Sequence, residues 1–480
     1  MRPNNWTQLC LIFLLWVMTA VAARAQVFNT LLSFDGANGY APGSRMSLIQ
    51  GIDGDFYGTT SEGGAYGHGN IFRLSSDGIL TTIYSFCSQS GCEDGYYPNA
   101  GLILGADGNF YGTTFYGGGS NQICRQGCGT IFKVTPQGTQ KTLYTFCAQS
   151  NCKDGLYPTA PLTLATDGNF YGTTYGDNLN RHGTVFRITP GGTLTTIHNF
   201  RGGSDDEYPQ AGLIQATDGY LYGTGRNTAF RVTRAGGLTP IYTFCSQPNC
   251  TDGGDPAGGL VQASDGNFYG TTNQGGANGL GGTVFSLTPS GILTTLYSFC
   301  GQANCPDGFE SYSGLVQATD GNFYGTTSRG GAAAAGTVFQ VTSAGSLTTL
   351  HSFCTESGCD DGAGPQSGLF QATNGTVYGS TPVDGSNACE CGTIFTLSMG
   401  LGPFVSLPRS WGKMGSTTFV FGQGLTRTSD VSFDGTPAHF TVVSDTLLKA
   451  KVPTGATTGY VTVTTPSGTL TSNVPFHVIP

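Results

Sequence analysis

Aromatic and acidic side chains recur together along the chain. Tyrosine stands directly before proline in three segments, at Tyr97, Tyr157 and Tyr208. An aspartate recurs shortly before each new unit, at Asp35, Asp94, Asp154, Asp206, Asp252, Asp307 and Asp361, and the last six are the candidate binding residues. Aromatic rings stack on the faces of sugars, and carboxylates accept hydrogen bonds from sugar hydroxyls. The pattern predicts a glycan-binding surface, and the alternative interpretation is an Asp-Gly turn whose following residue packs between repeated units.

The cysteines are the second set of residues that could form disulfides or bind metal. The 15 cysteines include Cys10 near the N-terminus, so an even number follows it, as is typical of an oxidising compartment. Five pairs have four residues between the partners: Cys87 and Cys92, Cys147 and Cys152, Cys245 and Cys250, Cys300 and Cys305, Cys354 and Cys359. This repetition favours local disulfides over zinc sites, because zinc needs four converging ligands. We expect a sixth local disulfide between Cys124 and Cys128.

Cys389 and Cys391 differ from the other pairs because a single residue separates them. A disulfide across one residue is strained and readily reduced. A redox role for this pair therefore stays open beside a structural one.

No catalytic motif accompanies these residues. The six histidines are unrelated to the repeated pattern, and the sequence contains no P-loop, nucleophile motif or HExxH motif. We therefore predict no catalytic residue, no metal and no cofactor. Retaining glycosidases need two carboxyl groups about 5 Å apart, which one sequence cannot reveal. An extracellular hydrolase or lyase acting on carbohydrate remains the alternative function.

These residues are positioned by seven copies of one unit. The unit centres on FYGT or a close variant, and its tyrosines are Tyr57, Tyr111, Tyr171, Tyr222, Tyr269, Tyr324 and Tyr378. Consecutive copies lie 47 to 60 residues apart, which is room for four strands and their loops. Asp-Gly precedes FYGT in six copies and Asn-Gly in the seventh, and both dipeptides favour tight hairpin turns.

The ends of the array predict its topology. Before the first complete unit the sequence has a segment of the fourth-strand type, FNTLLSF at 28–34. The last unit ends after its third strand, GTIFTL at 392–397. The N-terminal strand therefore completes the seventh unit, as ring closure requires. We predict an all-β chain whose residues 26–398 form a seven-bladed β-propeller. An open solenoid would instead need capping repeats.

The repeated DGNFYGTT, GTVF and LTTLYSF resemble the GloVer tandem repeats of bacterial secreted "choice-of-anchor" proteins, over roughly residues 27–397. The resemblance implies a secreted or surface location and carries no known activity. Residues 400–480 do not contain the repeat. Their segment VPTGATTGYVTVTTPSG resembles the IPT/TIG immunoglobulin-like domain. That resemblance implies a small β-sandwich that serves as a spacer or binding module.

The N-terminus predicts export. An apolar run follows Arg2 and ends in Ala23-Arg24-Ala25, which is typical of a cleavable signal over 1–25. The run is short for a transmembrane helix, so we expect no membrane span after cleavage. The net charge of −9 becomes more negative once the leader is removed, which argues against nucleic acid as a partner. We expect a monomer that is secreted or on the cell surface, with the periplasm as an alternative.

In a propeller of this kind, tight turns lie on one face, and the loops between second and third strands lie on the other with the connections between units. We call the second face the long-loop face. Function tends to reside on loops held by a rigid scaffold, so we expect the binding surface there. The sequence favours noncatalytic binding or adhesion to glycan or a surface protein. A purely structural surface spacer is the third hypothesis.

Overall fold

The computed structural model describes residues 26–479 except 44, 177–181, 204–207, 280, 356–357 and 387–388. The predicted leader and Asp206 therefore lie outside the described residues. Over the described part, the protein is all-β with short 3-10 turns at η1 (Ser90–Cys92), η2 (Ser150–Cys152), η4 (Pro248–Cys250) and η5 (Leu425–Arg427). None of its described helices is long and apolar enough to cross a membrane.

Each sequence repeat forms an antiparallel sheet in the order of its strands. The first strands are β3 (Ile49–Gln50), β7 (Ile103–Leu104), β11 (Thr163–Leu164), β15 (Ile214–Gln215), β19 (Val261–Gln262), β23 (Val316–Gln317) and β27 (Phe370–Gln371). The second strands are β4 (Phe56–Glu62), β8 (Phe110–Thr114), β12 (Phe170–Thr174), β16 (Leu221–Thr224), β20 (Phe268–Thr272), β24 (Phe323–Thr327) and β28 (Val377–Thr381). The first sheet gains an extra strand, β2 (Tyr40–Pro42), beside β4.

The third strands are β5 (Asn70–Leu74), β9 (Thr130–Val134), β13 (Thr184–Ile188), β17 (Thr228–Val232), β21 (Thr283–Leu287), β25 (Thr337–Val341) and β29 (Thr393–Ser398). The fourth strands are β6 (Leu80–Ser85), β10 (Gln140–Thr145), β14 (Leu194–Asn199), β18 (Leu238–Thr243), β22 (Leu293–Ser298) and β26 (Leu347–Ser352). The seventh sheet takes its fourth strand from the N-terminus, because β1 (Val27–Ser33) pairs antiparallel with β29.

Packing explains the glycine of the FYGT unit. A Cβ added to Gly58 would lie 2.5 Å from Cζ of Phe72 on the next strand and 3.0 Å from Cδ2 of Leu48. The equivalent glycines of the other repeats face the same Phe and Leu positions: Gly112, Gly172, Gly223, Gly270, Gly325 and Gly379. Glycine is therefore required so that the phenylalanine of the third strand can lie flat across the second strand.

Neighbouring sheets pack through the FYGT aromatic residues. The ring centroids of Tyr57 and Phe110 are 4.2 Å apart, so the tyrosine of one repeat rests on the phenylalanine of the next. The same contact recurs between other sheets, and the last repeat repeats it with the first, since Tyr378 and Phe56 lie 4.6 Å apart. The hydrophobic core is thus divided among successive interfaces between sheets rather than concentrated in one centre.

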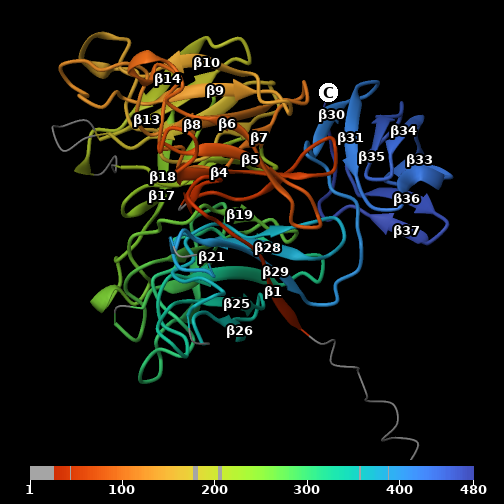
Figure 1. Ribbon diagram of the computed structural model, residues 1–480. Coiled ribbons are helices and arrows are strands. Elements are labelled where there is room, and N and C mark those ends of the chain that lie inside the picture. Colours follow the sequence, from red (N-terminus) through yellow and green to blue (C-terminus); the bar gives the residue numbers. More distant parts are fainter. Residues whose placement is uncertain are drawn as a thin grey trace, which may run out of the picture.

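The C-terminal strands form a separate lobe beside the repeated sheets, drawn in blue in Figure 1. They are β30 (Trp411–Lys413), β31 (Thr417–Phe421), β32 (Asp430–Phe433), β33 (Thr436–Pro437), β34 (Phe440–Ser444), β35 (Leu447–Lys451), β36 (Val461–Thr465), β37 (Gly468–Thr471) and β38 (His477–Ile479). One sheet contains β31, β35 and β34, and another contains β33, β32, β36 and β37. The lobe has its own core around Val420, Val463 and Phe476.

This lobe also contacts the repeated sheets. Phe421 and Leu447 are buried in the same cluster as Leu104. Thr373, in the tight turn of the seventh repeat, receives a 2.9 Å hydrogen bond from Nε2 of Gln423. The C-terminal lobe therefore packs on part of the face that carries the tight turns.

Candidate functional site

The tight-turn aspartates are partners of the FYGT tyrosines. The Tyr57 hydroxyl donates to Asp53 over 2.6 Å, and the same pairing recurs in the next five repeats. Burial and the hydrogen bond to Asp265 raise the pKa of Tyr269 to about 12. The sequence signal for this pair was the constant spacing, in which the tyrosine follows the aspartate four positions later. The aspartates therefore stabilise the repeat, in addition to their role in the turn.

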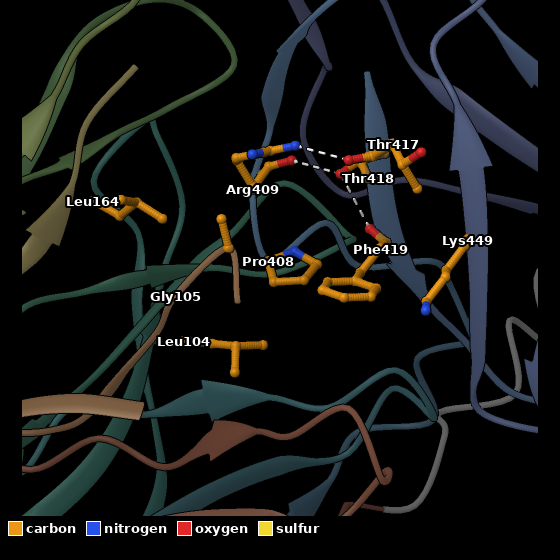
Figure 2. A pocket seen from close by; sticks show the side chains of 10 residues that line it. Leu104, Gly105, Leu164, Pro408, Arg409, Thr417, Thr418, Phe419 and Lys449 are labelled. Carbon is orange, nitrogen blue, oxygen red and sulfur yellow. Dashed lines mark hydrogen bonds between the residues drawn. The ribbon is translucent and has the colours of Figure 1, made fainter. Parts of the chain in front are cut away.

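A small hollow lies between this face and the C-terminal lobe. Figure 2 shows it between Leu104 and Leu164 on one side and Pro408, Phe419 and Lys449 on the other. Its volume is about 200 Å³, whereas ligand pockets usually span roughly 300 to 1,000 Å³. We interpret it as an imperfectly filled contact between the two parts of the chain.

The aspartates of the connecting loops serve the loops themselves. Asp94 is fully buried and accepts hydrogen bonds from the Tyr84 hydroxyl at 2.7 Å and from the Ser88 backbone at 2.9 Å. Equivalent bonds form at Asp154, Asp252, Asp307 and Asp361. Burial and the bond to Asp307 raise the pKa of Tyr297 to about 12. This placement supports the turn-forming interpretation of these aspartates, whereas Asp206 lies outside the described residues.

Every expected cysteine pair is bonded. The five repeated loops contain the disulfides between Cys87 and Cys92, Cys147 and Cys152, Cys245 and Cys250, Cys300 and Cys305, and Cys354 and Cys359. Cys124 is bonded to Cys128, and Cys389 to Cys391. Two groups of three nearby ligand atoms occur among the described residues, and every cysteine in them belongs to a disulfide. The arrangement is therefore that of a disulfide-stabilised protein.

The three predicted tyrosines share an unusual backbone conformation. Tyr97, Tyr157 and Tyr208 have φ values of 60°, 59° and 52°. Equivalent positions in the other repeats also have positive φ, at Ala41, Asp255, Glu310 and Gly364. The left-handed region costs a residue with a side chain roughly 1–2 kcal/mol, and such strain concentrates at functional sites. The fold imposes this conformation, while the side chain at the position changes from repeat to repeat.

The tyrosines lie in two aromatic groups on the long-loop side, one around Phe115 and one formed by Tyr175 and Tyr208. Tyr157 stacks on Phe115 with ring centroids 5.0 Å apart, and Tyr208 lies 5.0 Å from Tyr175. Tyr97 lies 6.4 Å from the same Phe115. All five rings are half-buried, so each has one part packed and another part accessible. We call them, with Tyr116, the aromatic arc.

A cavity of about 510 Å³ adjoins the arc. It is lined by Arg45, Tyr97, Asn99, Phe115, Tyr116, Thr159, Tyr175 and Gln210. Nη2 of Arg45 donates to Oε1 of Gln210 over 2.5 Å, although 165 residues separate them. Burial lowers the pKa of Arg45 to about 10, partly offset by Asp255 and Tyr175. The segments that lead into the first strands β3 and β15 of the first and fourth repeats therefore meet beside this cavity.

Sequence reasoning identified only part of this site. Of the three tyrosines predicted to bind ligand, Tyr97 is among the residues that line the cavity, and Tyr157 and Tyr208 are not. The prediction missed Phe115, Tyr116 and Tyr175, which directly follow the second strands β8 and β12. Their signal was present as FY and Y after YGTT in the second and third repeats. Arg45 was also missed, because its side chain meets its partners only in the assembled sheets.

Fold and sequence comparisons define a repeat protein with an appended immunoglobulin-like domain. The model of the Gloeobacter/Verrucomicrobia repeat matches residues 17–228 and 224–437, and that of the IPT/TIG domain matches residues 404–478. The chain belongs to the Gloeobacter/Verrucomicrobia repeat family. No curated protein matches it.

Solved structures share the fold at low sequence identity. A fungal alcohol oxidase of the AA5 family, in complex with copper, is 12% identical with a TM-score of 0.54, covering 95% of this chain and 100% of that one. The extracellular domain of a putative hybrid two-component system from B. thetaiotaomicron is 12% identical with a TM-score of 0.50. This match covers 92% of the present chain and 51% of the other. These likenesses concern the fold alone.

Proposed function

We propose that residues 26–398 form a closed seven-bladed propeller that binds glycan, without catalysis, through its long-loop face. Closure is supported by the pairing of β1 with β29 and by the contact of Tyr378 with Phe56, which joins the last repeat to the first. Residues 400–480 act as an appended IPT/TIG module. Its packing on the tight-turn face leaves the opposite face for a ligand.

The observation that carries the glycan proposal is the cavity beside the aromatic arc. Its volume suits a small sugar, and its walls combine tyrosine and phenylalanine rings with amide, hydroxyl and guanidinium groups. Aromatic rings provide stacking surfaces for the apolar faces of sugars, while the polar groups pair with hydroxyls. This is the residue mixture expected of a sugar site.

Export of the protein is supported by the disulfides and by the predicted leader. Disulfides persist in oxidising compartments outside the cytosol. A secreted or surface-exposed glycan-binding protein would meet polysaccharides in the same compartment, which agrees with the chemistry of the cavity.

The test is a glycan array on the mature protein, followed by an activity screen on each glycan that binds. Binding without turnover supports a binding module, and turnover would replace it with the hydrolase or lyase alternative. The Tyr97→Ala variant should weaken binding by about 1–3 kcal/mol. Tyr66→Ala is the matched control, because Tyr66 is 54% exposed and lies outside the cavity lining. An array without any specific ligand would overturn the proposal.

A further inference from the structure

Among the described residues that line the cavity, Arg45 is the one cation. Arg45 is half-buried as a residue, and in the described part of the chain no carboxylate lies within ion-pair distance of it. Its side-chain partner is the neutral amide oxygen of Gln210. Because the pKa of Arg45 stays near 10, the guanidinium is charged at neutral pH.

Two described acidic residues on this side, Asp255 and Glu310, have other partners. Asp255 accepts a 2.9 Å hydrogen bond from Nδ2 of Asn273, and Glu310 pairs with Arg329 over 3.2 Å. Asp255 stabilises the charge of Arg45 through space but does not contact it. A carboxylate in place of the neutral Gln210 amide adds Coulombic attraction and accepts two parallel N–H bonds from the guanidinium instead of one.

We infer that the cavity selects glycans that carry a carboxylate, with Arg45 holding the carboxylate and the aromatic arc stacking on the sugar ring. This inference rests on the proposed glycan binding and adds the ligand class. The planar guanidinium presents paired N–H donors that match a carboxylate, so a uronic acid unit satisfies both parts of the site. The ligand carboxylate would replace Gln210 as the acceptor, and the Gln210 amide would become available to a sugar hydroxyl.

The experiment compares acidic and neutral forms of the same sugar chains. Oligomers of galacturonate, glucuronate and mannuronate are titrated beside their methyl esters, which keep the sugar backbone and remove the charge. At least one acid should bind ten times more tightly than its ester. Arg45→Gln should abolish that difference, and Arg45→Lys should retain part of it, since lysine keeps the charge but loses the paired donors. Neutral glycans from the array serve as the control for an intact site.

Each result separates the two proposals. If neutral glycans bind but no acid is preferred, the carboxylate inference is overturned and the glycan proposal stands. If no glycan binds, both fail. Tighter binding of sulfated neutral oligosaccharides than of any uronate would overturn the choice of carboxylate. Should Arg45→Gln fail to fold, the wild-type protein still decides, because the preference for acid over ester must weaken as the salt concentration rises.

Discussion

Replacing the three tyrosines whose backbone lies in the left-handed region tests whether the aromatic arc binds ligand or only holds neighbouring repeats together. Tyr97, Tyr157 and Tyr208 are each changed to alanine and, in parallel, to glycine. Glycine is the informative second choice because Gly364 occupies the equivalent position of the seventh repeat with φ of 63°. It removes the ring and also relieves the backbone strain, whereas alanine removes only the ring.

The expected magnitudes follow from burial and backbone conformation. A fully buried aromatic residue costs roughly 3–5 kcal/mol when truncated to alanine, so a half-buried tyrosine should cost about 2 kcal/mol. The glycine variants recover about 1 kcal/mol of this loss through relief of strain. Both substitutions should weaken glycan binding by about 1–3 kcal/mol, the scale of an aromatic anchor.

Denaturant unfolding measures stability, and calorimetric titration with the best array ligand measures affinity. Tyr220→Ala is a control on the tight-turn side, where Tyr220 is 37% exposed and contacts Arg231. That variant should leave affinity unchanged. A loss of 3–5 kcal/mol in stability at Tyr97, Tyr157 or Tyr208, with unchanged affinity, would refute a binding role for the arc.

Three further predictions concern the scaffold. Deleting residues 26–34 should lower the melting temperature far more than deleting residues 400–480. The first deletion removes the strand paired with β29 and the buried ring of Phe34. Equal losses of melting temperature from the two deletions would contradict ring closure. Burial lowers the pKa of His351 below 6.5 despite its contact with Asp361. The contribution of His351 to the free energy of unfolding should therefore be fully present above about pH 6.5 and decline as pH falls below that value. His351→Tyr, which restores the residue of other repeats, should flatten that decline in melts between pH 4 and 8, and an unchanged slope would contradict it. Alkylation without reductant should leave the five repeated cysteine loops unmodified in mass spectra, whereas labelled Cys87 would contradict their bonding.

Sequence alone predicted the features that depend on local geometry. Asp-Gly turns, alternating strands and the spacing of Cys87 and Cys92 involve residues a few positions apart, so their outcome is determined within one repeat. The unmatched strands at the two ends also predicted the pairing of β1 with β29, since an incomplete sheet needs its missing strand. Repetition strengthened each prediction, because the same local pattern recurs in most of the units.

Tertiary structure decided which side chains meet. The repeated aspartates and the three tyrosines looked like one group in the sequence, yet Asp94 is buried within its own loop while Tyr97 lines the cavity. Arg45 reaches Gln210 only because the arrangement of the sheets brings the segments before β3 and β15, in the first and fourth repeats, close together. Strand periodicity determines which face of a sheet a residue occupies, but convergence between repeats depends on the accumulated rotation from sheet to sheet, which no local pattern records.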